Sequence, residues 1–324
     1  MNLRERFEKT MEFGSIDRVP YFEEGIREEV IEVWRQQGLE TDQDIDQLFP
    51  TDIREEILLD LDPHPEPQYG LTSEKQLEQL RINLNLDDGS RFPDDWENRI
   101  KKWRNREHVL MLRVHRGLFQ SLGIDDWQRF EEVMFLFSEQ PDFICEYMQI
   151  YGNFISELVS RALEDVEVDA AIFSEPIGGN HGSLISPAMY EEFALKNYEP
   201  IMKVLKEKGV RWIIVRTYAN AKVLIPVMLE YGFNCLWACE VNIESMDYRD
   251  IRRDFGKDLR LIGGIDLDTL RSGKAAIKRE IEEIVPPLIA EGGYIPLADG
   301  RVREDVSLEN YLYYRKLISQ FTKV

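Results

Sequence analysis

The chain has 324 residues, of which 43% are hydrophobic, and it can therefore bury one barrel-sized core or two smaller ones. Its formal net charge of −21 would repel nucleic acid and anionic membrane surfaces, so we expect neither as a partner. The sequence shows no bilayer-length apolar run, no apolar signal core and only three cysteines, which together predict a cytoplasmic protein without a disulfide framework.

The first half of the chain is the less regular half. Apolar runs predict strands at residues 19–22 and 108–114. Between them, residues 40–107 carry most of the Asp, Pro and polar clusters and predict an excursion from the core fold. Such an excursion explains why the chain is longer than the ~250 residues of a plain barrel.

The second half alternates regularly between strands and helices. Its strands are predicted from short apolar runs, and its helices from capping residues and helical spacing. In chain order the predicted strands are residues 169–174, 210–216, 235–241, 259–265 and 294–298, and the helices between and after them cover residues 186–208, 224–231, 247–255, 274–290 and a last one from about residue 307.

Five successive strand-helix units indicate parallel strands joined by helical crossovers. We therefore predict an α/β fold, a (β/α)8 TIM barrel with an elaborated N-terminal region, as a single domain over residues 1–324. A doubly wound open sheet is the alternative. That fold would need a glycine-rich phosphate loop after an early strand, and the sequence contains no G-x-G-x-x-G pattern.

Polar residues follow several of the predicted strands. The carboxyl ends of barrel strands build the active site, so these residues are the first candidates for it. Each one alone is equally well explained as a helix cap or a solvated turn residue, but an acid or arginine at several independent strand ends predicts a pocket for a polar ligand. The set comprises Glu23, Glu24, His115, Glu175, His181, Arg216, Tyr218, Asn220, Glu240, Asn242, Asp266, Asp299 and Arg301.

Within this set, we expect Glu240, Asp299 and Glu175 to be catalytic. Glu240 and Asp299 directly end apolar strands, and burial there would raise the pKa of each carboxyl toward values useful for a general acid or base. The alternative for Glu240 and Asp299 is an ion pair with an arginine. For substrate binding we expect a guanidinium that grips a carboxylate or phenolate, a loop histidine and neighbouring polar groups, namely Arg216, His181, Tyr218, Asn220, Asp266 and Arg301.

The sequence predicts no thiolate metal site. Cys235 and Cys239 lie four residues apart in a predicted strand, which places their α-carbons roughly 13 Å apart, too far to share one zinc ion. No His-x-Cys, Cys-x-x-Cys or His-Glu-x-x-His pattern occurs. An oxygen-ligand site formed by Glu175, Glu240 and Asp299 is conceivable, but no spacing rule supports it.

Motifs spread along nearly the whole chain resemble the uroporphyrinogen decarboxylase superfamily, which includes the haem-pathway decarboxylase and corrinoid-linked methyltransferases. The resemblance implies a (β/α)8 barrel with a pocket at its carboxyl-terminal face. The matching stretches are Asp17-Arg18-Val19-Pro20, Leu184-Ile185-Ser186-Pro187-Ala188-Met189-Tyr190-Glu191-Glu192-Phe193, Leu261-Ile262-Gly263-Gly264-Ile265-Asp266, Glu291-Gly292-Gly293-Tyr294-Ile295-Pro296 and Glu309-Asn310-Tyr311.

The motifs that define activity in that superfamily are altered. Where the decarboxylases carry an Arg-Gln-Ala-Gly-Arg run for substrate carboxylates, this chain has Glu23-Glu24-Gly25-Ile26-Arg27, and Ala298-Asp299-Gly300 replaces a Gly-His-Gly motif. Uroporphyrinogen, a polycarboxylate, is therefore not the expected substrate. In the zinc-dependent methyltransferases a His-x-Cys pair and a later cysteine bind the metal, and Arg216-Thr217-Tyr218 and Asp299 stand in the places that look equivalent.

The resemblance then favours a methyltransferase that moves a methyl group from a small methoxylated or methylated compound to a corrinoid (cobalamin) protein. Such O-demethylation needs no tightly bound cofactor, because the corrinoid is carried by the partner protein. The alternatives are a decarboxylase-like lyase acting on a carboxylated substrate and a non-catalytic barrel that binds a tetrapyrrole or a corrinoid protein. A homodimer is compatible with the sequence.

Overall fold

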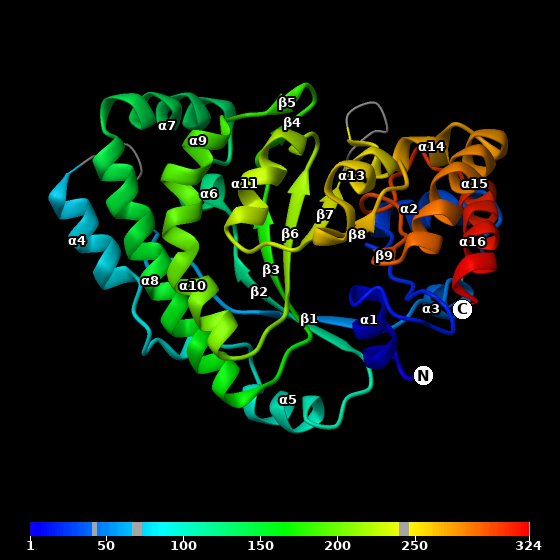
Figure 1. Cartoon of the computed structure of the whole chain (residues 1–324), viewed down its shortest axis with the longest axis horizontal. Coiled ribbons are helices and arrows are strands. Elements are labelled where there is room, and N and C mark those ends of the chain that lie inside the picture. Colours follow the sequence, from blue (N-terminus) through cyan, green and yellow to red (C-terminus); the bar gives the residue numbers. More distant parts are fainter. Residues whose placement is uncertain (41–43, 67–72, 240–245, 324) are drawn as a thin grey trace.

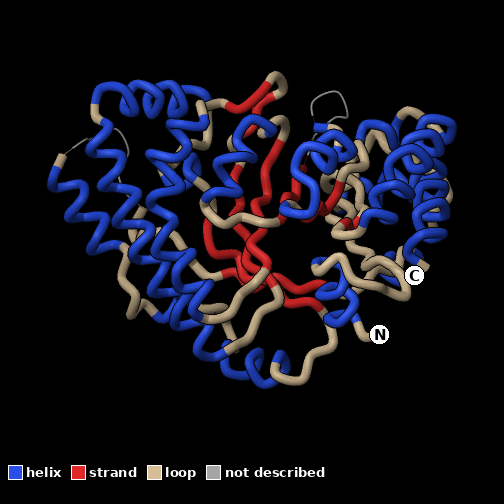
Figure 2. The backbone as a smooth tube through the Cα atoms, viewed as in Figure 1, coloured by secondary structure: helices blue, strands red, loops and turns tan. Residues whose placement is uncertain are grey.

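A computed structural model describes residues 1–40, 44–66, 73–239 and 246–323 of the chain, so Glu240 and Asn242 lie outside the described residues. Its centre is a curled, wholly parallel sheet, drawn in red in Figure 2. In their order across the sheet, the strands are β1 (Arg54–Leu58), β2 (Val109–His115), β3 (Ala170–Glu175), β6 (Trp212–Tyr218), β7 (Cys235–Cys239), β8 (Arg260–Gly263) and β9 (Tyr294–Ile295).

Helices surround this sheet (Figure 1). The early helices are α1 (Leu3–Met11), α2 (Glu28–Gln36), α3 (Ile45–Leu48), α4 (Glu74–Asn83), α5 (Trp96–Trp103), α6 (Leu118–Ser121), α7 (Trp127–Glu139) and α8 (Pro141–Asp165). The later ones are α9 (Pro187–Tyr190), a π-helical turn (Glu191–Leu195), α10 (Lys196–Glu207), α11 (Ile225–Glu230), α13 (Tyr248–Phe255), α14 (Leu267–Arg271), α15 (Lys274–Glu291) and α16 (Leu308–Thr322). A small hairpin, β4 (Gly178–Gly179) with β5 (Gly182–Ser183), follows β3.

The second half of the chain folds as its alternating pattern predicts. Strands β3, β6, β7, β8 and β9 are consecutive parallel neighbours, and a helix follows each of them. No reversal of strand order occurs among them, which excludes the doubly wound sheet. The α/β class and the parallel strand-helix units are therefore confirmed.

Within the described residues the sheet has seven strands, so the part of the expected (β/α)8 barrel that the structure shows is a curled, seven-stranded half-barrel. The segment of residues 19–22, predicted to be a strand, has extended backbone but no ladder. Pro20 lacks an N–H group, and the N–H of Tyr21 donates to the Asp52 side chain (2.9 Å) instead of to a neighbouring strand. One isolated bridge, between Ile26 and Val302, joins this segment to the chain after β9.

On its other side the same segment is joined to the chain before β1, because the backbone N–H of Asp52 donates to the carbonyl oxygen of Tyr21 (2.8 Å). A hollow of about 460 Å³ lies beside this contact and is lined by both segments, with Phe22 and Glu23 on one side and residues 49–54 on the other. Strand β1, which borders this hollow, lies within residues 40–107. The region expected to be an excursion therefore contributes a strand to the sheet, pairing Arg54 with Val109 and Leu58 with Arg113.

Side chains alternate between the two faces of the curled sheet, as the two-residue period of a strand requires. The inner face holds Met111, Ile172, Ile214, Trp237 and Ile262, all fully buried against one another. The alternate residues of the same strands face outward and pack against the surrounding helices in a larger core that includes Leu112, Phe173, Val215, Leu236 and Leu261. Which face a residue occupies decides whether it can reach the barrel interior.

Helix α1 closes the amino-terminal end of the sheet. Asn2 and Glu5 form a capping box, in which each side chain accepts from the backbone N–H of the other residue. This start fixes the helix so that Phe7 and Met11, both fully buried, join the inner core beside Val109. Ligands are therefore excluded from this end of the barrel interior.

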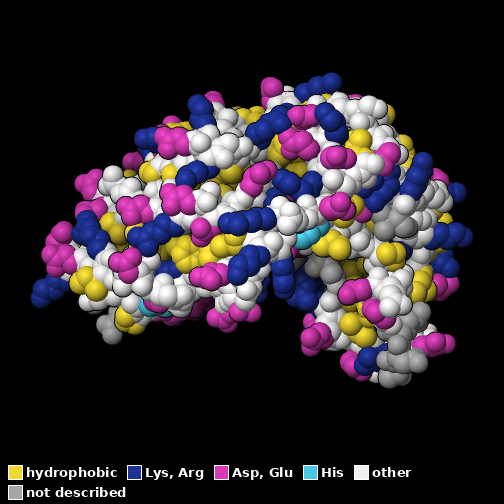
Figure 3. Space-filling model, turned by 90° about the horizontal axis from the view of Figure 1, so that it is seen from below, with side chains coloured by type: hydrophobic (Ala, Val, Ile, Leu, Met, Phe, Trp, Pro, Cys, Tyr) yellow, Lys and Arg dark blue, Asp and Glu magenta, His cyan; other side chains and the backbone are white. Residues whose placement is uncertain are grey.

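The face seen from below in Figure 3, on the side of α1 and α5, carries acidic and basic side chains interspersed with each other. The net negative charge is thus not gathered into one area of this face. Among the helices of the described chain, none combines the length and apolar character that a membrane span requires.

We predict that Phe7→Ala lowers the free energy of unfolding by about 3–5 kcal/mol, because it empties part of the inner core under the strands. Chemical denaturation monitored by circular dichroism measures this change. The control is Phe135→Ala on α7, where the side chain is largely exposed and the change should stay within about 0.5 kcal/mol. If the two substitutions lowered the free energy of unfolding equally, α1 would not contribute to the inner core as described.

Candidate functional site

A charged cluster occupies the inner face of the sheet near the carboxyl ends of its strands. Glu56 of β1 lies at its centre and accepts hydrogen bonds from Arg113 of β2 (3.0 Å) and Arg216 of β6 (2.5 Å). Arg54 of β1 also donates to Glu56. Arg113 and Arg216 each follow an inner apolar residue by two positions, which is why they point inward.

Trp237 of β7 supports this cluster from one side. The guanidinium carbon of Arg216 lies 4.1 Å from the centre of the indole ring, and that of Arg54 lies 4.6 Å from it. Burial opposes ionisation of Glu56, but the guanidinium groups of Arg216, Arg54 and Arg113 outweigh this and lower the pKa of Glu56 to about 2. Glu56 is therefore a permanent anion that fixes the positions of three arginines.

Asp299 lies in the loop after β9, in a niche built by the Gly263-Gly264 pair. Both glycines have positive φ angles, +103° and +88°, which side chains other than glycine rarely adopt. A Cβ at Gly263 would lie 2.4 Å from the Asp299 carboxylate, and one at Gly264 would lie 2.5 Å from the ring of Tyr248. The glycine pair thus permits the N–H of Gly264 to donate to Oδ1 of Asp299 at 2.8 Å.

The surroundings of Asp299 in this niche favour its protonated form. It is 1% exposed, and burial raises the pKa of its carboxyl well above the usual range, although the hydrogen bond from Gly264 opposes the shift. The carboxylates of Asp266, Glu280 and Glu24 add to the increase. Its Oδ2 atom is buried and has no hydrogen-bond partner among the described residues.

Glu24 connects the Asp299 niche with the arginine cluster. Its carboxylate lies 3.8 Å from a guanidinium nitrogen of Arg54. Its negative charge also raises the pKa of Arg216, Tyr218 and Asp299. Of these predicted site residues, Arg216 and Tyr218 lie at the carboxyl end of β6, and Asp299 lies in the loop after β9 at the same end of the sheet.

Glu175 is not part of this group, contrary to the expectation that it shares a cavity with Arg216. It follows the inner residue Ile172 by three positions and so points to the outer face, between the sheet and α9 and α10. There its carboxylate accepts hydrogen bonds from Tyr198 (2.8 Å), Tyr190 (3.2 Å) and the N–H of Leu118 (2.9 Å). The structure gives it the role of a buried anchor for the loop after β2.

The remaining predicted residues lie in turns and caps around the sheet. Asp266 is the N-cap of α14 and accepts from the N–H of Asp268, and the side chain of Asn220 accepts from the N–H of Lys222. His181 lies exposed at the tip of the β4-β5 hairpin, and Arg301 is exposed. Glu23 binds Tyr21 and Tyr314 through its carboxylate, and His115 stacks on Phe173 on the outer face.

The sequence interpretation did not include Arg54, Glu56, Arg113 or Trp237 among the site residues. The available signal was the two-residue period: Arg113 follows Val109 and Met111 at inward positions of an apolar strand, where an arginine needs a partner. Arg54 and Glu56 carry a weaker signal, because their strand contains three charged residues out of five. Only the pairing of β1 with β2 shows that these charges meet inside the sheet.

The described residues contain no group of three or more His, Cys, Asp or Glu side chains that could hold a metal ion. Cys235 and Cys239 both lie on β7 and face the inner core. Burial raises the pKa of the Cys235 thiol to about 12, so the thiolate that zinc needs is disfavoured there. The cysteines of β7, with the other residues that the structure describes, do not fit a thiolate zinc centre.

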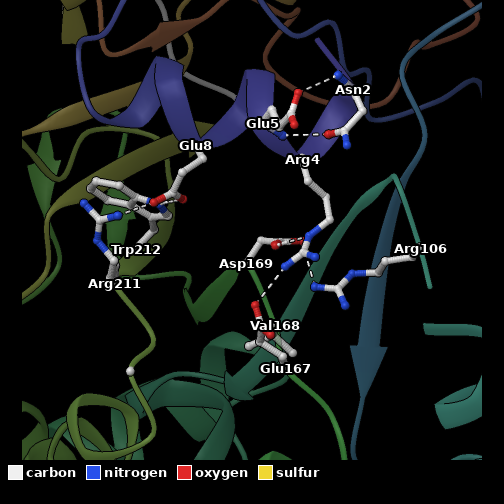
Figure 4. A pocket seen from close by; sticks show the side chains of 11 residues that line it. Asn2, Arg4, Glu5, Glu8, Arg106, Glu167, Val168, Asp169, Arg211 and Trp212 are labelled. Atoms are coloured by element: carbon white, nitrogen blue, oxygen red, sulfur yellow. Dashed lines mark hydrogen bonds and ion pairs between the residues drawn. The ribbon is translucent and has the colours of Figure 1, made fainter. Parts of the chain in front are cut away.

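A second hollow, of about 460 Å³, lies at the amino-terminal end of the sheet (Figure 4). Arg4 and Arg106 both bind Asp169 there, at 2.8 and 3.1 Å, and Glu8 accepts from the indole of Trp212. The close-up in Figure 4 shows these charges directed at one another. Paired charges at this end contribute to stability in barrel folds, whereas active sites lie at the carboxyl-terminal end.

The curled parallel sheet with a polar cluster at its strand ends defines a protein of the barrel-like α/β class. A family model, Uroporphyrinogen decarboxylase (URO-D), matches residues 126–310, more than half of the chain. The chain belongs to this family. The matched region includes Arg216, Trp237 and Asp299, while β1 and the cluster residues Arg54 and Glu56 precede it.

The chain also matches solved structures, at low similarity. An endo-β-1,4-xylanase of glycoside hydrolase family 10 from Gloeophyllum trabeum has a TM-score of 0.49 at 9% identity, over 92% of this chain and 96% of that one. Xylanase B from Clostridium stercorarium F9 has a TM-score of 0.39 at 12% identity, over 80% and 88% of the two chains. No match was found among curated proteins.

Glu175 should make stability depend on pH. Burial raises the pKa of its carboxyl from 4.5 to about 7, so the folded state favours the protonated form. The contribution of this group to the free energy of unfolding is therefore full below pH 4.5 and is lost as the pH rises to about 7. We expect Glu175→Gln to remove this loss, so that the variant gains stability relative to wild type between pH 5 and 8.

Denaturant unfolding at several pH values measures this difference between the two proteins. Exposed Glu304 provides the control, since Glu304→Gln should leave the wild-type pH profile unchanged. If the free energies of unfolding of wild type and Glu175→Gln differed by the same amount at every pH between 5 and 8, the carboxyl of Glu175 would have an ordinary pKa.

Proposed function

We propose that the chain is a methyltransferase that takes a methyl group from a small methoxylated or methylated compound, with a corrinoid protein as the acceptor. The observation that carries the proposal is Asp299, a neutral carboxylic acid in a dry niche with one oxygen free for a ligand. Methyl transfer from oxygen leaves an alkoxide or phenolate, and a positioned acid is what such a leaving group needs.

The residues of this chain act on the methyl donor. Asp299 donates its proton to the donor oxygen as the bond between that oxygen and the methyl carbon breaks, and the methyl group passes to the acceptor. The corrinoid, carried by its own protein, supplies the nucleophile for that carbon. Gly264 holds Oδ1 of Asp299, so the proton is presented on Oδ2. The carboxylate formed is reprotonated readily, because its surroundings favour the neutral form.

Glu24 supports a substrate other than uroporphyrinogen. The decarboxylases that the chain resembles hold substrate carboxylates with paired arginines after their first strand, and here Glu24 places a negative charge beside Arg54 and Asp299. Like charges repel, so a polycarboxylate is disfavoured at this position. A smaller donor with fewer charges fits better.

Decarboxylation of a small carboxylate is the second candidate, and the arginine cluster favours it. Arg54, Arg113 and Arg216 meet on the inner face and could hold a carboxylate. Asp299 would then protonate the carbon that loses carbon dioxide. The two candidates differ in the need for a corrinoid protein, which only methyl transfer requires.

We expect Asp299→Asn to lower demethylation by about 10²–10⁴-fold, the usual weight of a general acid, when reduced corrinoid protein and a methoxylated compound are supplied. The amide keeps the size of the side chain but has no acidic proton. Glu240→Gln, at a strand-end acid outside the described residues, should lower the rate similarly if that carboxyl shares the role. Initial rates of product formation measure both variants.

Glu175→Gln is the matched control, since Glu175 is also a buried carboxyl with a raised pKa but lies on the outer face. It should retain most of the activity. Wild-type rates in Asp299→Asn would remove Asp299 from the mechanism. Turnover of uroporphyrinogen without a corrinoid protein would contradict methyl transfer and support the decarboxylase candidate.

A further inference from the structure

Three hydrogen-bond donors of the inner cluster have no acceptor among the described residues. They are the indole N–H of Trp237 and the Nε–H groups of Arg216 and Arg113. All three atoms are buried, and the Trp237 and Arg216 side chains are 0% and 5% exposed. A buried donor without an acceptor destabilises the fold, so this arrangement is suited to a ligand that supplies acceptor atoms.

These donors belong to one continuous stretch of the inner wall. Arg216 pairs with Trp237 across β6 and β7, and its guanidinium lies on the Trp237 ring. Arg113 and Arg216 share Glu56, whose two oxygens are already occupied by their terminal nitrogens and by Arg54. Glu56 therefore positions the arginines but leaves both Nε–H groups unmatched.

The charge balance of this wall favours one additional negative charge. In the described part of the chain, the guanidinium groups of Arg54, Arg113 and Arg216 face the carboxylates of Glu24 and Glu56. Burial of Asp299 favours its uncharged form. Among the five arginine and glutamate side chains just named, the positive charges outnumber the negative ones by one, and a monoanion would balance them.

We propose that Arg113, Arg216 and Trp237 form a binding site for a single carboxylate group of the substrate. This deepens the proposed function by naming the substrate class, a methoxylated or methylated monocarboxylate, and rests on that function only for the methyl group. A carboxylate has two oxygens in one plane, which match guanidinium N–H groups and an indole N–H. A dianion such as phosphate would exceed the available positive charge and meet Glu24 and Glu56.

The carboxylate site also separates two roles, substrate binding and proton donation, between different residues. The carboxylate would be held at β2, β6 and β7, while Asp299 after β9 remains free for the reacting oxygen at another part of the same molecule. The negative charge of Glu24 raises the pKa of both Arg216 and Asp299. A substrate held at one end and protonated at the other is thereby oriented for reaction.

Binding of small probes to the full chain tests this site without any corrinoid protein. We choose methoxyacetate and 4-methoxybenzoate, each matched by its uncharged amide, and measure the Kd by isothermal titration calorimetry. At least one carboxylate should bind roughly tenfold or more tightly than its amide, the weight of one hydrogen bond to a charged acceptor. High salt should weaken the binding of the carboxylate and leave the binding of the amide unchanged.

Trp237→Phe removes the indole N–H and keeps an aromatic ring beside the arginines. It should weaken carboxylate binding several-fold, about the effect of one lost hydrogen bond, without changing amide binding. Trp127→Phe is the matched control, because Trp127 is largely exposed on α7 and should have no effect. Arg113→Gln should weaken carboxylate binding further, and circular dichroism shows whether each variant is folded.

Three results would overturn the carboxylate site: no binding by either carboxylate, equal binding of carboxylate and amide, or unchanged carboxylate affinity in folded Trp237→Phe and Arg113→Gln. The assay is independent of methyl transfer. Selective carboxylate binding together with absent demethylation would reject the proposed reaction and keep the carboxylate site. Demethylation of uncharged donors alone would support the proposed reaction and reject the carboxylate site.

Discussion

The two-residue period of the strands determines which polar side chains can act together in this molecule. Arg113 and Arg216 fall in phase with the inner apolar residues of β2 and β6, so they meet at Glu56 inside the curled sheet. Glu175 falls out of phase by one residue and anchors the outer layer instead. A position at the end of a strand is therefore not enough to place a residue in the site. The residue must also lie on the inner face of the sheet.

Burial inside the sheet then gives the site its chemistry. Guanidinium groups around Glu56 keep it ionised, with a pKa lowered to about 2, whereas Asp299 has no such partner and its burial favours the protonated form. The same strand-end region thus shifts the pKa values of two carboxyl groups in opposite directions. Glu56 positions arginines, and Asp299 is the proton donor in the methyl transfer that we propose.

The second half of the fold could be predicted because its strands are apolar and its helices carry clear caps, as at Ser186-Pro187. Strand β1 could not be found in this way, since its charges are stable only where β2 and β6 supply partners. Asp299 was predicted from its position after a strand, and Arg216 and Tyr218 likewise. The face of Glu175 was missed, because a polar residue that ends a strand gives no sign of its direction.

The central claim is that Asp299 is a neutral acid at neutral pH, and difference infrared spectroscopy of wild type and Asp299→Asn tests it most directly. The two proteins should differ by the carbonyl band of a protonated carboxylic acid, present in wild type near pH 7 and absent from the variant. A difference spectrum at the same pH that contains only carboxylate bands would show that Asp299 is ionised. That result would contradict its role as proton donor.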